Sequence, residues 1–259
     1  MTTIASPLLV PTLLPTASRA LEAAEAFNEQ ARRSVAQMVS TDGKVSAALL
    51  DQEQLAAHGL AWLTTYTTAL RELLNWAERL EAGAGLGELE ALILQAGFGE
   101  YLAQMAGGIA ISAGEIVRPS DMGLDASALA TPAAEALATN GNTNAVRMRI
   151  AALIEEGGAA GEFGDLGLDD EALNMIRDQF RRFVNEQVIE PAHQWHLNDE
   201  LIPMPIVNQM AEMGVFGLTI PEENGGFGMG KVVMCVVTEE LSRGYIGVGS
   251  LGTRSEIAS

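Results

Sequence analysis

Residues 46–81, SAALLDQEQLAAHGLAWLTTYTTALRELLNWAERLE, decide the fold of the first part of the chain. The stretch contains no proline, and its apolar residues recur at alternating spacings of three and four positions, as on one face of an α-helix. A second apolar stripe runs beside the first. A helix with two apolar faces is covered on more than one side, so we expect it to be the central helix of a bundle. The first stripe comprises Ala56, Leu60, Leu63, Thr67, Leu70, Leu74 and Ala77, and the second Trp62, Tyr66, Leu73 and Leu80.

Three more helices are expected around this central one. Thr16 or Ser18 carries a hydroxyl group that can cap the first of them, and the glycines of residues 83–87 separate the central helix from the next. We expect little or no β-sheet. The three helices are predicted over residues 17–40, 88–116 and 142–156.

The glycine-rich stretch GGAAGEFGDLGLDD, residues 157–170, divides the chain into two helical units. After it, Asp169 or Asp170 can cap a helix that Pro191 ends or kinks. The apolar run VVMCVV at residues 232–237 is expected to be helical, because the helix-like TEELSR follows it. The predicted organisation is a flexible arm over residues 1–15, a helical-bundle extension over 16–156, a linker over 157–168 and a second helical domain over 169–259.

Composition limits the possible partners. The 259 residues carry 15 basic and 34 acidic side chains, which gives a net charge of −19 at pH 7. This charge repels nucleic-acid phosphates and anionic lipids, so neither nucleic acid nor a membrane is expected as a partner. The apolar residues near the N-terminus are interrupted by prolines and lack a basic flank, which argues against a signal peptide. Cys235 is the only cysteine, which excludes an intramolecular disulfide and favours a reducing cytoplasm.

Motifs that could carry chemistry give weak signals. The loop GGFGMG at residues 225–230 departs from the dinucleotide-binding spacing and lacks the Lys-Ser or Lys-Thr of a mononucleotide-binding loop. Glu190 and His193 form one Glu-x-x-His pair with Pro191 inside it, whereas a di-iron bundle uses two such pairs, so no metal site is expected. Cys235 lies in an apolar run and is expected to be an inert small hydrophobe. These residues therefore define no autonomous active site.

From Leu173 onward, the order of features resembles the N-terminal helical domain of the flavin-dependent acyl-CoA dehydrogenase family. The resemblance rests on LNMIRDQFRRFVNEQVIEPAHQW, MAEMGVFGLTIPEENGGFGMG, VVMCVVTEELSRG and GVGSLGTRSEIAS. Its most specific part is the order of a glycine turn, a Pro-Glu-x-x-Gly-Gly-x-Gly loop and a helix containing Glu-Glu-Leu. The extension in front, especially LILQAGFGEYLAQMAGGIAISAGEIVRPSDMGL, is similar to that of a longer subgroup that includes the methylsuccinyl-CoA dehydrogenases.

The resemblance implies an all-α fold: a helical-bundle extension followed by the family's N-terminal helical domain, with the chain stopping before the middle β-domain. For the full-length enzyme it implies FAD, an acyl-CoA substrate, electron-transfer flavoprotein as a partner and a homo-oligomer. In the family, a glutamate removes the α-proton and the flavin takes the β-hydride. The domains that bring FAD and this glutamate would follow Ser259, so no residue here is assigned a catalytic role. The chain alone is expected to be inactive and not to retain FAD, and Glu239 and Glu240 are expected at the surface or at a domain seam.

The resemblance also implies that the helix over residues 249–259 lines the far end of the acyl pocket. Ser250, Thr253 and Arg254 are then candidate substrate-binding residues, and Arg254 could pair with the distal carboxylate of a dicarboxylic acyl-CoA. Alternatively, Arg254 is exposed or pairs with an acidic residue at a domain seam. The substrate expected is a short branched or dicarboxylic acyl-CoA, with methylsuccinyl-CoA as one candidate. A different class of function, a non-catalytic helical interaction module or a truncated gene remnant, stays open.

Overall fold

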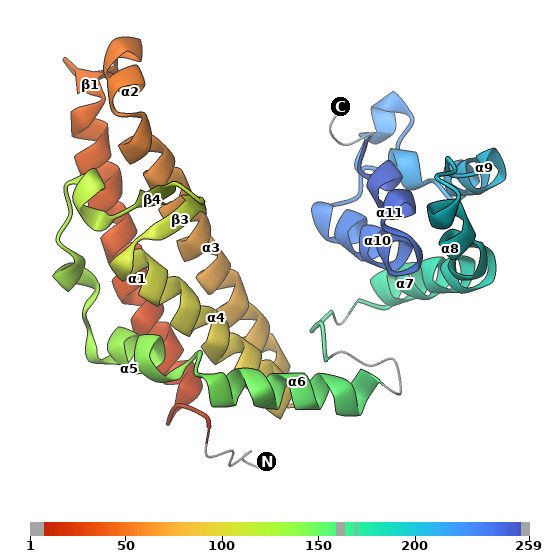
Figure 1. Ribbon diagram of the computed structural model, residues 1–259, viewed down its shortest axis with the longest axis horizontal. Helices are drawn as coiled ribbons and strands as arrows, with labels where there is room; N and C mark the ends of the chain where they lie inside the picture. Colours follow the sequence, from red (N-terminus) through yellow and green to blue (C-terminus); the bar gives the residue numbers. More distant parts are fainter. Residues whose placement is uncertain (1–7, 159–163, 169, 255–259) are drawn as a thin grey trace. The chain divides into compact units, whose positions relative to one another are not determined.

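The structure is a computed structural model that describes residues 8–158, 164–168 and 170–254. The chain divides into two compact units, Met1–Gly167 and Leu168–Ser259 (Figure 1). Each unit has a hydrophobic core of its own. The fold is all-α apart from two small hairpins. In the described parts of the chain, no helix is long and apolar enough to cross a membrane.

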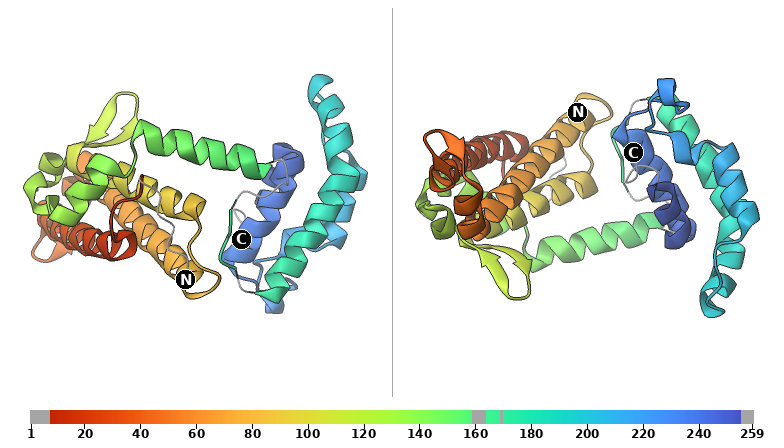
Figure 2. Two further views of the ribbon diagram at one scale, coloured as in Figure 1. Left: turned by 90° about the horizontal axis from the view of Figure 1, so that it is seen from below. Right: turned by 90° about the horizontal axis from the view of Figure 1, so that it is seen from above.

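The first unit is a bundle in which three long helices run alongside one another (Figures 1 and 2). As predicted, the stripe from Ala56 to Ala77 faces the core, where Leu63 and Leu70 are fully buried. Phe27 and Phe98 from the neighbouring helices fill the same core. The helices of this unit are α1 (Leu13–Met38), α2 (Ala47–Gln52), α3 (Gln54–Ala82), α4 (Glu88–Gly107), α5 (Pro132–Asn140) and α6 (Asn144–Gly158), with the 3₁₀ turns η1 (Pro119–Met122) and η2 (Ala126–Leu129).

The first two predicted helices have different boundaries in the structure. The first helix begins at Leu13, before Thr16 and Ser18, and Thr16 is buried with its hydroxyl group donating to the carbonyl oxygen of Pro11 at 3.2 Å. The predicted helix over residues 46–81 is interrupted at Glu53, which separates α2 from α3. Thr16 lies inside the helix and its hydroxyl group donates to a carbonyl oxygen, so Thr16 does not act as the N-terminal cap.

Two β-hairpins were not predicted. The first joins β1 (Ser40–Thr41) to β2 (Lys44–Val45) through Asp42 and Gly43, which both have positive φ, as tight two-residue hairpin turns require. The second joins β3 (Ile109–Ser112) to β4 (Glu115–Val117) and replaces the end of the helix expected over 88–116. That helix stops at Gly107 because Gly108 adopts φ 133°, which lies outside the helical region.

In the second unit, a long helix changes its winding before a proline. Asp170 caps α7 (Glu171–Phe183), which continues through a π-helical turn η3 (Val184–Val188) into α8 (Ile189–Leu197). Pro191 lies inside α8, so it does not end the helix. Proline has no N–H group and its ring crowds the carbonyl of residue i−4, and the wider π turn just before it accommodates this.

Of the remaining helices of the second unit, α10 packs on α7 and η3, and α11 packs on α10. As predicted, the apolar run at residues 232–237 is helical. Gly244 at the end of that helix lies so close to Val184 that a Cβ atom would stand 2.5 Å from its Cγ1. These elements are α9 (Met204–Glu212), η4 (Val215–Gly217), η5 (Glu222–Asn224), α10 (Lys231–Gly244) and α11 (Ile246–Gly252).

Candidate functional site

The three candidate substrate-binding residues lie together at the C-terminal end of α11. Thr253 follows the helix and donates its hydroxyl hydrogen to the carbonyl oxygen of Ser250 at 3.0 Å. The guanidinium group of Arg254 donates to the hydroxyl oxygen of Ser250 at 3.0 Å, and the side chain is exposed. Among the described residues, Ser250 is the only hydrogen-bond partner of Arg254, and no carboxylate there pairs with it. As far as the described residues extend, the arrangement leaves a cation with spare donors at the end of α11.

A tight corner between α10 and α11 fixes the position of this end. Tyr245 connects the two helices in an extended conformation, and Val248 is fully buried behind it. At Gly249 a Cβ atom would lie 3.0 Å from the Cα atom of Ser242 and even closer to its hydroxyl oxygen. Only glycine allows this approach of the two helices without displacement.

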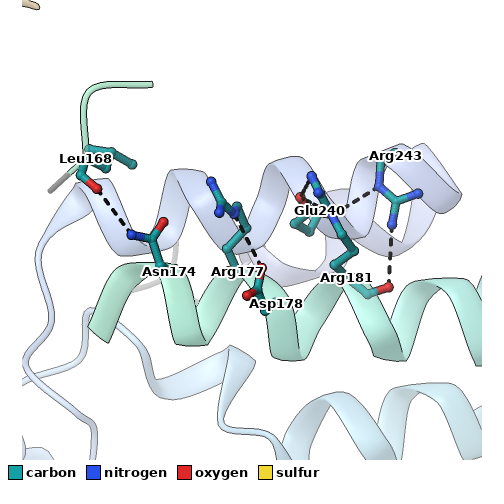
Figure 3. A network of polar contacts seen from close by, with 7 residues as sticks. All are labelled: Leu168, Asn174, Arg177, Asp178, Arg181, Glu240 and Arg243. Carbon is teal, nitrogen blue, oxygen red and sulfur yellow. Dashed lines mark hydrogen bonds and ion pairs between the residues drawn. The ribbon is translucent and has the colours of Figure 1, made fainter. Parts of the chain in front are cut away.

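An ionic cluster holds α10 against α7 (Figure 3). Glu240 of α10 is buried, with only 4% of its surface exposed. Arg181 of α7 donates to its Oε1 atom at 2.7 Å through one NH₂ group, and Arg243 donates to its Oε2 atom at 3.0 Å through Nε. Arg243 also reaches Asn185, whose side-chain oxygen accepts from it at 2.8 Å. The cluster therefore joins α7, the π turn and α10.

The balance of forces at Glu240 favours the carboxylate form. Burial alone raises the pKa of this carboxyl group, because it disfavours the charged form. The hydrogen bonds from Arg181 and Arg243 act in the opposite direction and outweigh burial, so the pKa of Glu240 lies below its ordinary value. The same contact with Glu240 raises the pKa of Arg181. Glu240 is therefore ionised at neutral pH and neutralised by its neighbours.

Of the two positions expected for these glutamates, the surface holds for Glu239, which is exposed, but not for Glu240, which is buried; a place at a domain seam stays a prediction. A signal was available in the sequence: Glu240 stands next to Leu241 and four positions after Val236, on the apolar stripe of α10. A charged residue on the buried face of a helix needs partners. The second arginine of the cluster follows three positions later in the same helix.

Beside the cluster, a further arginine of α7 is incompletely paired. Figure 3 shows Arg177 one helical turn before Arg181, on the side that faces α10. Its Nε atom is buried and has no hydrogen-bond partner among the described residues, and the Oδ1 atom of Asp178 lies 3.7 Å away. Asn174, at the start of the row, donates to the carbonyl oxygen of Leu168 at 3.3 Å. This row of polar groups continues the seam between α7 and α10.

The glycine-rich loop before α10 does not offer a phosphate cradle. Its backbone N–H groups from Asn224 to Met229 all donate to backbone carbonyl oxygens, three of them across to residues 217–220. Phe227 lies over Gly214, where a Cβ atom would stand 2.5 Å from its ring. A phosphate-binding loop needs free N–H groups, so this loop is a structural turn and does not fit the pyrophosphate of FAD.

In the described part of the chain, the candidate metal ligands do not come together to form a site. The described residues contain no group of three or more histidine, cysteine, aspartate or glutamate side chains that could hold a metal ion. Glu190 and His193 are both exposed. Cys235 is exposed on α10, and its expected inertness stays a prediction. The strand-like run around it buries only Val236 and Val237.

One hollow of about 390 Å³ opens in the second unit, between the π turn with its preceding helix and α9. The Oε1 atom of Gln209 is buried in this region and has no hydrogen-bond partner within the residues that the structure describes. The lining residues are Gln179, Arg182, Phe183, Glu186, Gln187, Gln209, Glu212 and Met213.

Comparisons with known proteins identify a matching family profile and several similar proteins. Residues 170–259 match the sequence profile of the acyl-CoA dehydrogenase N-terminal domain. The chain is 57% identical over 249 residues to the (2S)-methylsuccinyl-CoA dehydrogenase of Cereibacter sphaeroides, an alignment that covers 95% of this chain and 45% of that protein. Over 82 residues it is 40% identical to a glutaryl-CoA dehydrogenase of Desulfococcus multivorans and 35% identical to a benzylmalonyl-CoA dehydrogenase of Aromatoleum aromaticum. These two alignments cover 31% of this chain and 21% of each relative.

The helical structure of the second unit is consistent with the match to the acyl-CoA dehydrogenase N-terminal domain. Residues 170–259 belong to the acyl-CoA dehydrogenase family. The similarity to the methylsuccinyl-CoA dehydrogenase extends through the helical bundle of the first unit as well. The chain spans slightly less than half the length of that relative and about a fifth of the length of the other two.

Proposed function

We propose that this chain supplies the helical extension and the N-terminal domain of an FAD-dependent acyl-CoA dehydrogenase. The reaction is oxidation of the Cα–Cβ bond of a short branched or dicarboxylic acyl-CoA. The observation that supports this most is the 57% identity to a methylsuccinyl-CoA dehydrogenase over 95% of the chain, in both helical units. In such a reaction, hydrogen bonds to the thioester carbonyl group stabilise the enolate that forms when the α-proton leaves.

The proposed substrate class is a dicarboxylic acyl-CoA, with methylsuccinyl-CoA as the first candidate. Three relatives are named for methylsuccinyl, glutaryl and benzylmalonyl thioesters, and each of these acyl groups carries a second carboxylate. A carboxylate that enters a closed acyl pocket must be paired with a donor group. Within the described part of the chain, the guanidinium group of Arg254 bonds only to Ser250, which orients it and leaves further N–H donors for a ligand. We therefore propose that Arg254 binds the distal carboxylate, with Ser250 and Thr253 shaping the same end of the pocket.

In this proposal, FAD binding and removal of the α-proton belong to other parts of a full-length enzyme. They provide no fitting cradle for FAD, so no step of the reaction is assigned to the flavin in this chain and no glutamate here is proposed as the base. We expect the 259 residues alone not to retain FAD. Electron-transfer flavoprotein as the electron acceptor and a homo-oligomeric enzyme complete the proposal. The non-catalytic interaction module remains the second candidate, because the first unit builds a separate core outside the dehydrogenase domain.

A chimera tests the proposal. This chain replaces the matching 45% of the Cereibacter sphaeroides enzyme, and the chimera is assayed with methylsuccinyl-CoA and with an uncharged branched acyl-CoA. We expect a yellow, active enzyme. In it, Arg254→Gln should lower kcat/KM for methylsuccinyl-CoA by an amount equivalent to roughly 2 to 5 kcal/mol, because the substrate carboxylate is left unpaired. The uncharged substrate should be affected little.

Arg254→Lys serves as the matched variant, since it keeps the charge and loses the two-pronged geometry. It should retain part of the preference for the dicarboxylic substrate. Equal losses on both substrates would make Arg254 a structural residue. A chimera that binds FAD but oxidises neither thioester would contradict the proposed function.

A further inference from the structure

The sequence contains two Asn-Gly pairs, Asn140-Gly141 and Asn224-Gly225. In such a pair, the backbone nitrogen of the glycine can attack the side-chain amide carbon of the asparagine, because glycine has no Cβ atom to hinder the approach and adopts many backbone conformations. The attack needs a side-chain amide that is free to turn and a glycine that is free to move. The two pairs differ in both respects.

The first pair is fixed by its surroundings. The side-chain amide nitrogen of Asn140 donates to the carbonyl oxygen of Ala136 at 3.0 Å, in the last turn of α5. Gly141 is buried with a helical backbone, and its N–H group donates to the carbonyl oxygen of Leu137 at 2.7 Å. A Cβ atom at Gly141 would stand 2.4 Å from the carbonyl oxygen of Gln95 in α4. Attack on Asn140 therefore requires α5 to separate from α4.

The second pair lies at the exposed end of the short 3₁₀ turn η5. Asn224 is exposed, and its side-chain amide has no hydrogen-bond partner among the described residues. Gly225 is exposed as well, and nothing lies within 4 Å of a Cβ atom placed on it. Its backbone has φ 84°, a conformation that glycine adopts without strain. In this pair the amide can turn and the glycine has open space around it.

One hydrogen bond restrains the attacking nitrogen of the second pair. The N–H group of Gly225 donates to the carbonyl oxygen of Glu222 at 2.9 Å, across a turn of three residues that buries none of them. Exposed turns with few buried contacts open at a much lower free energy than elements of a packed core. The opening needed at Asn224 is therefore local, whereas the opening needed at Asn140 disrupts helix packing.

We propose that Asn224 is a site of spontaneous deamidation. The backbone nitrogen of Gly225 forms a bond to the side-chain amide carbon of Asn224, and the bond from that carbon to the amide nitrogen breaks. The amide nitrogen leaves as ammonia with the proton of the Gly225 nitrogen, and a cyclic imide remains. Water then opens the imide at either carbonyl carbon and gives aspartate or isoaspartate. The net reaction consumes water and releases ammonia, and it does not depend on the proposed dehydrogenase function.

The isoaspartate product alters the loop that follows η5. Its backbone runs through the former side chain, so the chain becomes longer by a methylene group. The N–H groups of Phe227 and Met229 donate to the carbonyl oxygens of Gly217 and Leu218 at 2.9 and 2.8 Å, and the added length displaces these pairs. Either product also adds a negative charge next to Glu222. The amide hydrogens of this loop should therefore exchange faster in the deamidated chain.

A test follows both pairs in the same molecules. The whole chain is incubated for days in mildly alkaline buffer at physiological temperature, and peptide mapping by mass spectrometry resolves the replacement of NH₂ by OH at each asparagine. In the folded chain, Asn224 should deamidate at least about tenfold faster than Asn140, which corresponds to a barrier difference of about 1.4 kcal/mol. In concentrated urea, where the structure is lost, the two rates should become similar.

Asn224→Gln is the matched variant, because its longer side chain would have to close a larger ring. It should prevent both the loss of ammonia from the loop and the faster hydrogen exchange after incubation. An Asn224 that stays intact in the folded chain, or that reacts no faster there than Asn140, would overturn the proposal. A tenfold difference that persists in urea would also contradict it, because the folded structure would then not be the cause. If incubated Asn224→Gln exchanges as fast as the incubated wild type, the change in the loop does not come from Asn224.

Discussion

At the scale of single residues, Glu240 is a buried charge at the seam between α7 and α10. It is buried, and it accepts hydrogen bonds from two arginines that come from different helices. A hydrogen bond that involves a charged group contributes about 1.5 to 3 kcal/mol, and an unpaired buried group costs a similar amount. Because Arg181 and Arg243 are partly exposed, water can replace some of the loss when Glu240 is removed.

We therefore expect Glu240→Gln to lower the free energy of unfolding of the second unit by roughly 1 to 3 kcal/mol. Urea unfolding followed by circular dichroism measures the change. Glu239→Gln is the matched control, since Glu239 is the exposed neighbour, and it should change stability by less than about 0.5 kcal/mol. Equal effects of the two substitutions would show that the ion cluster contributes nothing specific.

The pH dependence of this difference has a defined sign. Because the pKa of Glu240 is lower in the folded chain than its ordinary value of 4.5, its contribution is complete above pH 4.5 and is lost as pH falls through the folded pKa. The gap in stability between the wild type and Glu240→Gln should therefore be constant from neutral pH down to about pH 5 and shrink in more acidic solution. A gap that grows on acidification would reverse the assignment.

The candidate site could be predicted only in part. The composition of the end of α11 and the family resemblance indicate Ser250, Thr253 and Arg254, and the structure brings these residues into mutual hydrogen bonds, while their role stays a prediction. The Glu240 cluster was missed because one of its two arginines, Arg181, comes from α7, 59 residues away in the sequence. Periodicity along one helix indicates which face is buried, but it does not indicate which side chain of another helix lies opposite.

At the scale of elements, helices were predictable where a stripe extends over several turns, and small hairpins were not. The stripe of α3 specifies its buried face at every turn, so Leu63 and Leu70 lie in the core as expected. The four strands are two to four residues long, too short for an alternating pattern to be recognised. The β3–β4 hairpin is fixed instead by packing: Gly59 of α3 leaves room for Val117, and a Cβ atom there would collide with it.

The α10–α11 corner yields a prediction from the same kind of contact. Gly249→Ala should destabilise the second unit by about 1 to 3 kcal/mol, because the new methyl group meets the backbone of Ser242 and not only its side chain. Gly107→Ala in α4 is the contrasting variant, since nothing lies within 4 Å of the added atom. Alanine in an open helical position should stabilise by about 0.5 to 1 kcal/mol. Thermal unfolding of both variants measures the two signs, and a neutral Gly249→Ala would mean that the helices can separate without cost.

At the scale of the whole molecule, the two units have separate cores. The first core draws on α1, α3, α4 and α5, and the second on α7 to α11, with no buried residue shared between them. Units that each bury their own apolar surface unfold as separate cooperative transitions unless a large interface couples them. The similarity to one relative through both units, and to the other two relatives over only 82 residues, fits a modular chain.

Substitutions placed in one core should therefore affect one transition. Leu63 is fully buried in the first core, and Leu63→Ala should lower the stability of the first unit by about 2 to 5 kcal/mol, because it removes apolar contacts and leaves a cavity. Glu240→Gln should shift only the transition of the second unit. Differential scanning calorimetry of the two variants and of the combined variant resolves this, and the combined shifts should add, since the sites share no partner. A single transition that both substitutions move together would show that the two helical units fold as one cooperative structure, and the modular reading of the chain would then be wrong.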